Sequence, residues 1–369
     1  MRVLVGMPDK DSLGGPIYCE PPFVAALRTS GVETDEEVYV YGDGAKPTPL
    51  LKRVTRVIDA ARRLRRRTRE TQYDIVHLNT SIDEKCVLRD SFTFALLRSS
   101  SVPVHLKMQG SDAGFLATKN PFWRWATRRL FARAASIGVL STEEYANFLA
   151  AGCPAEKLSI VKYVVGAEAF RYDPGFHKKH GLADGTPILL FSARFVPAKG
   201  LQDVIRACAE LREAGRQFAL FCLGDGPVRA EAEILAAELG IAENTRFFGY
   251  IPEADTAAFH ANSTAFVFPT YHDEGFPLVI LKSIAAGLPI ITTRIRGAAD
   301  YMTDPENCLW TEPRNPAALA ERITKLLDNP DLRQKMSTNN RHLATQFTAT
   351  AVAKEYIELY KSLMSEKGG

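Results

Sequence analysis

Short apolar runs alternate with longer helix-like runs along nearly the whole chain. The first series of strand-like runs comprises Val3 to Val5, Val38 to Tyr41, Ile75 to Leu78, Val104 to Met108 and Ile137 to Leu140. The second series comprises Ile188 to Phe191, Phe218 to Leu223, Arg246 to Phe248, Ala265 to Phe268 and Pro289 to Thr292. Alternation of this kind predicts an α/β protein in which parallel sheets are covered on both faces by helices.

The two series predict two doubly wound, Rossmann-like domains. A chain of 369 residues is too long for one ordinary core. A stretch rich in Gly, Pro, Asp and His separates the series, so we place a linker at 166–186, between domains at 1–165 and 187–350. Residues 351–369 have the pattern of a last helix. Two such domains facing each other leave a cleft at the carboxyl ends of their strands, where we expect the ligand.

The composition is that of a globular, soluble protein, with 46% apolar and 24% charged residues. The apolar runs are far shorter than the roughly 18 residues that a membrane span needs. The N-terminus lacks the pattern of a signal peptide, so we expect a cytoplasmic protein. The six cysteines form no CxxC pair, which favours reduced thiols over disulfides or a zinc site.

Positive charge is concentrated in two segments of the first half. Between Lys46 and Arg69 there are ten basic residues against one acid, with apolar residues at helical spacing. A second segment, Trp123 to Arg133, places arginines beside tryptophans. Such helices suit an anionic membrane surface, so we predict contact through Lys52 to Arg69 and Trp123 to Arg133. A solvated basic face with ordinary core aromatics is the open alternative, and no motif indicates nucleic acid.

An acidic turn lies between a strand-like and a helix-like run in the second half. Glu274 and Gly275 precede Pro277, and the amides at a helix start attract an anion or a sugar oxygen. The alternative is that Glu274 only caps the helix.

Other strand ends carry residues suited to phosphate binding. Arg194 follows a strand and Lys199 precedes the next helix, a pair that can hold a diphosphate, although a salt-bridge role is the alternative. Gly224 to Pro227 and Gly249-Tyr250 follow two further strands, where backbone could line a nucleotide. Gly14-Gly15 after the first strand is a weaker candidate for a phosphate nest, since it forms no GxGxxG.

The chain resembles the retaining glycosyltransferases of the GT-B fold, and in particular glycosyltransferase family 4. The matching segments are Gly14-Gly15, Ala193-Arg194 with Lys199-Gly200, Gly224 to Pro227, Phe248 to Tyr250, Pro269, Glu274 to Pro277 and Ala285 to Pro289. The resemblance implies sugar transfer from a nucleotide diphosphate to an acceptor, with retention and without a metal. It also implies that the last helix, after about residue 351, returns to the N-terminal, acceptor-binding domain.

The resemblance implies roles for individual residues. Arg194 and Lys199 would hold the diphosphate, Glu274 would meet sugar hydroxyls, and Gly14-Gly15 would close over the donor phosphate. We predict Glu274, Arg194 and Lys199 as catalytic residues. The predicted donor-binding residues are Gly14, Gly15, Arg194, Lys199, Gly224, Asp225, Gly249, Tyr250, Glu274, Gly275, Phe276, Pro277, Leu278 and Lys282.

Two of the departures from the family pattern bear on the predicted roles. Lys282 stands where the family usually has a second glutamate for the ribose, and a lysine can only donate hydrogen bonds. Gln109 stands where many members have a histidine near the acceptor, and it cannot act as a general base. We predict Gln109 and Asp112 on the acceptor side.

The sequence thus predicts a metal-independent, cofactor-free retaining glycosyltransferase that uses an NDP-sugar, with a UDP or GDP sugar favoured. Its acceptor would be a lipid-linked or surface-polysaccharide glycan in bacteria, at the inner face of the plasma membrane. The alternative is a catalytically impaired nucleotide-sugar-binding or scaffolding subunit, motivated by Lys282 and Gln109. A dehydrogenase is disfavoured because the chain lacks the GxGxxG fingerprint.

Overall fold

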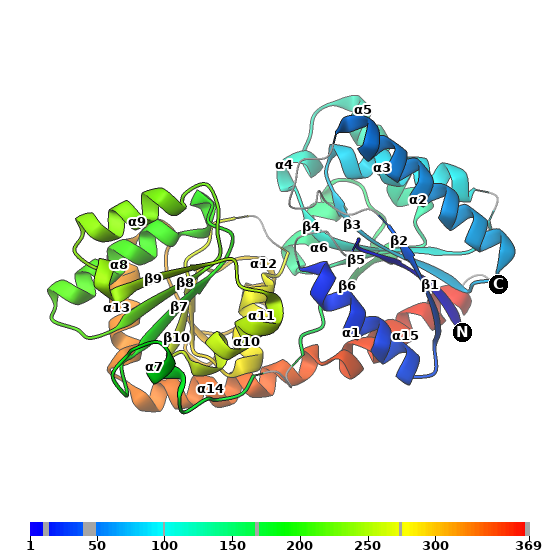
Figure 1. Ribbon diagram of the computed structural model, residues 1–369. Coiled ribbons are helices and arrows are strands. Elements are labelled where there is room, and N and C mark those ends of the chain that lie inside the picture. Colours follow the sequence, from blue (N-terminus) through cyan, green and yellow to red (C-terminus); the bar gives the residue numbers. More distant parts are fainter. Residues whose placement is uncertain (10–14, 40–48, 99, 167–169, 273–274, 366–369) are drawn as a thin grey trace. The chain divides into compact units, whose positions relative to one another are not determined.

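The computed structural model describes residues 1–9, 15–39, 49–98, 100–166, 170–272 and 275–365 (Figure 1). The chain forms two compact units. The first comprises Met1–Val164, Asp273–Phe276 and Phe347–Gly369, and the second comprises Val165–His272 and Pro277–Gln346. Each unit has its own parallel sheet.

The first unit has a six-stranded parallel sheet in the order β2-β1-β3-β4-β5-β6. Its strands are β1 (Arg2–Met7), β2 (Glu33–Val38), β3 (Ile75–Ile82), β4 (Val104–Ser111), β5 (Ser136–Val139) and β6 (Leu158–Ile160). Its helices are α1 (Pro16–Thr29), α2 (Leu50–Glu70), α3 (Glu84–Leu97), α4 (Ala113–Leu116), α5 (Pro121–Arg133), α6 (Thr142–Ala150) and α15 (Ala349–Ser365).

Helices cover both faces of this sheet (Figure 1). From β1 the chain moves to the neighbouring edge strand β2, and from β2 it moves across the sheet in the other direction, through β3 to β6. Because the crossovers between parallel strands are right-handed, α1 lies on one face of the sheet and α2, α3 and α5 lie on the other. Accordingly α15 packs against α1, while α3 packs against both α2 and α5. The last helix therefore completes the α1 side of the first unit.

The second unit has a six-stranded parallel sheet in the order β12-β11-β10-β7-β8-β9. Its strands are β7 (Ile188–Ser192), β8 (Ala219–Leu223), β9 (Thr245–Gly249), β10 (Ala265–Phe268), β11 (Ile290–Thr292) and β12 (Cys308–Trp310). Its helices are α7 (Phe176–Lys179), α8 (Leu201–Glu213), α9 (Arg229–Glu238), α10 (Glu253–Asn262), α11 (Leu278–Ala286), α12 (Arg296–Tyr301), α13 (Pro316–Leu327) and α14 (Pro330–Ala344). Strands β7 and β8 are buried along their whole length, as expected of parallel strands covered on both faces.

The prediction of helix-covered parallel sheets is confirmed, with differences at the sheet edges. The strand expected at 38–41 shares only Val38 with the observed β2 (Glu33–Val38), a charged edge strand without an apolar run, and 40–41 lie outside the described residues. Edge strands β6 and β12 were not predicted, since each has only three residues.

The stretch expected as a linker, 166–186, falls within Val165–His272, the first part of the second unit. Within it, Phe176 is 4% exposed and packs on Phe221 and Phe259.

Candidate functional site

The second sheet brings four predicted loops to one edge. Strands β10, β7, β8 and β9 are neighbours in that order, so the segments that follow them leave the sheet side by side. The chain runs from β7 outward to β9 and then returns to β10 on the other side of β7. The strand order therefore reverses between β7 and β10. In open α/β sheets such a switch point, at the carboxyl ends of the strands, is where ligands bind.

Two cations lie at this switch point. Arg194 follows β7 and is exposed, whereas Lys199 ends a short 3-10 turn before α8 and is 8% exposed. The Lys199 ammonium lies 5.7 Å from the ring centroid of Phe268, at the end of β10. Burial, followed by repulsion from Arg194, lowers the pKa of Lys199 to about 7. A buried ammonium close to a second cation is a favourable site for an anion.

Glycines let the backbone of these loops approach closely. The Gly224 amide donates to the Gly249 carbonyl at 2.8 Å, and the Phe195 amide donates to the Asp225 carbonyl at 2.8 Å. The loops after β7, β8 and β9 are thus tied together. The exposed Asp225 carboxylate accepts from the Gly226 amide at 2.7 Å, which lowers its pKa, and then from Arg229 at 3.0 Å.

Replacing Gly224 by Ala is expected to lower the free energy of unfolding by about 3 kcal/mol or more. A Cβ there would lie 1.8 Å from the Ala193 carbonyl oxygen, and φ is +128°. Urea unfolding of Gly224→Ala checks this. The matched control is Gly215→Ala, where φ is +74° but no atom lies within 4 Å, so only about 1 kcal/mol should be lost. Equal losses of unfolding free energy in both variants would contradict the close approach of Gly224 to the Ala193 carbonyl.

The acidic turn is described only in part, since Asp273 and Glu274 lie outside the described residues. Gly275 and Phe276 are buried and belong to the first unit. A Cβ at Gly275 would lie 2.7 Å from Leu140 Cδ1 and 3.1 Å from Glu144 Oε2, and Phe276 packs on Phe347 at 5.7 Å. Gly275 therefore permits a close approach to Leu140 and Glu144.

The neighbouring helix starts have few side-chain caps. Pro277 precedes α11 and provides no side-chain cap, and Leu278 begins the helix. Lys282 lies on α11 and is half-buried. Gly14 lies outside the described residues, and Gly15 precedes α1, also without a side-chain cap. Helix α1 begins directly after Gly15, at Pro16.

A buried polar cluster surrounds Gln109 at the carboxyl end of β4. Gln109 Nε2 donates to Asn79 Oδ1 at 2.6 Å and to Glu20 Oε1 at 3.3 Å. Glu20 also pairs with Lys107 at 2.7 Å, and both side chains are fully buried. Asn79 in turn donates to the Gly6 carbonyl at 3.0 Å. The side chain of Gln109 is therefore held by residues from α1 and β3.

Lys107 lies among aromatic rings. Its ammonium is 5.1, 5.4 and 5.5 Å from the ring centroids of Phe23, Tyr163 and Tyr356. Rings at this distance stabilise a cation. Sequence reasoning missed Glu20, Lys107 and Asn79, although a lysine inside the apolar run 104–108 signals a buried partner.

The two oxygens Glu20 Oε2 and Gln109 Oε1 are buried without a hydrogen-bond partner in the described part of the chain. Orphaned buried acceptors are uncommon and mark places where water or a ligand hydroxyl can bind. Asp112, the other predicted acceptor-side residue, is exposed and accepts from the Phe115 amide at 2.9 Å, so it caps α4.

Many arginines of the first predicted basic segment, which forms α2, have carboxylate partners. On α2, Arg63 pairs with Glu37 at 2.6 Å and Arg67 lies 3.7 Å from Asp35, both on the edge strand β2. Three more arginines of α2 also have carboxylate partners: Arg56 with Asp9, Arg62 with Asp59, and Arg66 with Glu70. Much of the charge on α2 is therefore neutralised within the unit.

Among the described residues, no group of three or more His, Cys, Asp or Glu side chains could hold a metal ion. All six cysteines are free thiols. In the part of the chain that the structure describes, no helix has the length and hydropathy needed to cross a membrane.

Comparison with known proteins supports the glycosyltransferase class that the sequence predicts. Residues 18–163 match the family described as glycosyl transferase 4-like domain, and residues 174–343 match glycosyl transferases group 1. The 2-deoxystreptamine glucosyltransferase of Streptomyces kanamyceticus is 31% identical over 56% of this chain and 54% of its own length. The GDP-mannose-dependent alpha-(1-6)-phosphatidylinositol monomannoside mannosyltransferase of Mycolicibacterium smegmatis is 29% identical over 61% of each chain. The chain thus spans between half and two thirds of the length of these relatives.

A solved structure has the same fold. The Anabaena protein HepE, in complex with UDP and glucose, superposes with a TM-score of 0.76 at 17% identity, covering 98% of this chain and 100% of that one. The two parallel-sheet units therefore form the GT-B fold of glycosyltransferases. Within that class, the chain belongs to the group 1 glycosyl transferases, with a family 4-like N-terminal domain.

Proposed function

We propose that the protein transfers a sugar from a nucleoside diphosphate to a hydroxyl acceptor, with retention of the anomeric configuration and without a metal. The observation that carries this proposal is the pair of cations, exposed Arg194 and buried Lys199, at the switch point of the second sheet. Breaking the anomeric bond develops negative charge on the leaving diphosphate. Fixed cations at that place lower the barrier and can do the work of a divalent metal.

The remaining site residues have complementary roles in this proposal. Glu274 binds sugar hydroxyls, and the amides that start α11 bind the sugar or phosphate. Lys282, on the same helix, contacts a phosphate and does not accept from the ribose. Gln109 binds the acceptor hydroxyl through its unpartnered Oε1.

The relatives guide the choice of donor and acceptor. The Mycolicibacterium relative is named as GDP-mannose-dependent and acts on a phosphatidylinositol monomannoside, while HepE binds UDP. We therefore propose a UDP or GDP sugar as donor and a lipid-linked or surface-polysaccharide glycan as acceptor. The alternative of an impaired scaffolding subunit is not favoured, because the relatives are named as transferases.

A turnover assay with UDP and GDP sugars tests the activity, and proton NMR of the product tests retention through the anomeric coupling. Release of the nucleoside diphosphate with an α-linked product from an α-donor is expected. Binding of UDP or GDP without hydrolysis or transfer of any sugar would favour the scaffold instead.

Donor binding is expected to take up a proton above pH 7. In the free protein Lys199 is half neutral at about pH 7, because burial lowers its pKa. A bound diphosphate favours the ammonium and raises that pKa, so the dissociation constant should rise up to about tenfold per pH unit above about 7. Calorimetry of UDP or GDP at pH 8, in buffers with different ionisation enthalpies, measures the uptake. Lys199→Met should abolish it, and equal uptake in that variant would assign the proton to another group.

We also propose that the protein acts at the inner face of the plasma membrane as a peripheral protein. The ion pairs on α2 leave α5, with Arg128 and Arg129, as the main basic surface for anionic lipids. Helix α2 adds three exposed apolar residues at its start, Leu50, Leu51 and Val54.

A further inference from the structure

A cavity of about 190 Å³ lies in the first unit beside the start of α5. Its walls come from α4, the connection to α5, the first turns of α5 and the end of α6. A single buried water needs only about 10–15 Å³. The cavity therefore has room for a phosphate group.

Three cations line this cavity, namely Lys119, Arg124 and Arg128. All three are exposed, and among the described residues none of them forms an ion pair with a carboxylate. Arg124 and Arg128 are four residues apart on α5 and so project from one face of the helix. The cavity is a region of uncompensated positive charge, in contrast to α2.

A buried hydroxyl also lines the cavity. Thr127 lies on the same face of α5 and is 4% exposed, and its Oγ1 has no hydrogen-bond partner in the described part of the chain. An isolated buried hydroxyl loses its bonds to water without compensation. An oxygen of a bound phosphate would supply the missing partner.

Arg128 is held in place by the end of α6. Its Nε lies 3.4 Å from the Ala151 carbonyl, a weak hydrogen bond. Gly152 has φ +94°, and a Cβ there would lie 2.8 Å from the same Nε. The glycine makes room for the guanidinium, which would otherwise be pushed away from the cavity wall.

Exposed apolar side chains lie on the same helix. Phe122 and Trp125 are 52% and 58% exposed, with ring centroids 6.3 Å apart. Arg129 lies over the Trp125 ring at 5.5 Å. Exposed aromatic rings next to cations are typical of surfaces that enter the headgroup layer of a membrane.

Helix α3, which packs against α5, also carries exposed apolar side chains. Leu88 and Phe92 are 52% and 39% exposed. They lie four residues apart on α3, on the opposite side of the helix from the buried Asp90.

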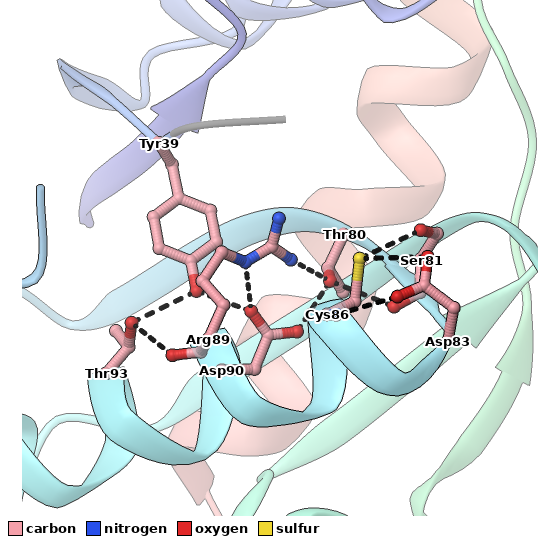
Figure 2. A network of polar contacts seen from close by, with 8 residues as sticks. All are labelled: Tyr39, Thr80, Ser81, Asp83, Cys86, Arg89, Asp90 and Thr93. Atoms are coloured by element: carbon pink, nitrogen blue, oxygen red, sulfur yellow. Dashed lines mark hydrogen bonds and ion pairs between the residues drawn. The ribbon is translucent and has the colours of Figure 1, made fainter. Parts of the chain in front are cut away.

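Buried polar contacts fix the rotation of α3 (Figure 2). Asp90 accepts from Tyr39 Oη, Thr80 Oγ1 and Arg89 Nε, each at 2.6 Å. The N-terminus is capped by Asp83, which accepts from the Cys86 amide at 2.8 Å. Because this network holds the inner side of the helix, Leu88 and Phe92 stay directed outward.

We propose that the cavity beside α5 binds the phosphate group of an anionic phospholipid, while Phe122, Trp125, Leu88 and Phe92 enter the headgroup layer. The three cations and the Thr127 hydroxyl bind the phosphate oxygens. This inference rests on the membrane contact proposed above and is independent of sugar transfer.

Flotation with phosphatidylcholine vesicles, with and without phosphatidylglycerol, tests the proposal on the full chain. The wild type should bind only the vesicles that contain phosphatidylglycerol. Arg124→Ala and Arg128→Ala should each weaken that binding about fivefold. Thr127→Val keeps shape and charge and should weaken it about threefold. Arg171→Ala, an exposed arginine of the second unit, is the matched control and should change nothing.

Three outcomes would overturn the proposal. If Arg171→Ala and Arg124→Ala lost the same amount of vesicle binding, the protein would be held by diffuse electrostatic attraction to the membrane and not by a specific site. Full binding by both Arg124→Ala and Thr127→Val would exclude the cavity. Stabilisation by inorganic phosphate in a thermal melt, with no vesicle binding by the wild type, would identify an ion site only. None of these experiments measures sugar transfer. A negative result would therefore overturn the phosphate site and leave the proposed activity to be tested by the turnover assay.

Discussion

Replacing Lys199 by Met is expected to lower the rate of sugar transfer by about 10²- to 10³-fold. Arg194→Ala should cause a loss of similar size. Both cations stabilise charge that develops on the leaving diphosphate, so kcat should fall by more than the donor KM rises. Steady-state kinetics with the preferred donor measures both constants. Arg206→Ala, an exposed arginine on α8 in the same unit, is the control and should keep its activity.

The loss in Lys199→Met should not come from unfolding. Burial lowers the pKa of Lys199 from 10.5 to about 7, so its charged form is disfavoured in the folded protein. Between these values the unfolded chain holds a proton that the folded protein lacks, and stability of the wild type should rise with pH there. Lys199→Met should lose this rise and be at least as stable as the wild type at pH 7. Full activity in Arg194→Ala and Lys199→Met would refute the diphosphate site.

Breaking the buried Glu20–Lys107 pair is expected to lower the free energy of unfolding by about 3–5 kcal/mol. Either Glu20→Leu or Lys107→Met leaves the opposite charge fully buried and unpaired. The double variant Glu20→Leu/Lys107→Met removes both charges, so it should recover most of that loss. Urea unfolding of the three variants measures the coupling. A double variant that is as unstable as the sum of the singles would show that the two charges are not coupled.

The same double variant separates folding from function. Without Glu20, Gln109 keeps only its bond to Asn79, so its amide is less well held. If Gln109 binds the acceptor, the double variant should raise the acceptor KM while the donor KM stays unchanged. Gln109→Ala should have the same effect, and combining the changes should add little, because both act through one side chain.

The residues of the proposed donor site could be placed at one edge of the sheet because each of them follows a local pattern in the chain. Arg194, Lys199 and the glycine turn at Gly224 to Gly226 follow predicted strands, and parallel strands carry their carboxyl ends to one edge of a sheet. The strand Ala265–Phe268 lies where the apolar run predicted it. Local patterns therefore sufficed to place these residues at the same edge.

The first unit was harder to predict because its important contacts join distant residues. Glu20 and Lys107 are 87 positions apart, and nothing near Glu20 in the chain reveals its partner. The edge strand β2 has no apolar run, and its carboxylates are the partners of Arg63 and Arg67 on α2. A charge count over Lys46 to Arg69 could not show that these arginines were already paired.

By itself, then, the sequence determined the two parallel-sheet units and the family, because apolar periodicity and glycine turns are properties of neighbouring residues. Only the tertiary structure decided which charges remain available. Packing neutralises much of α2, buries Lys107 against Glu20, and leaves Lys119, Arg124 and Arg128 around a cavity. The physical reason is that a charge acts according to its burial and its partners, and both depend on residues far away in the chain.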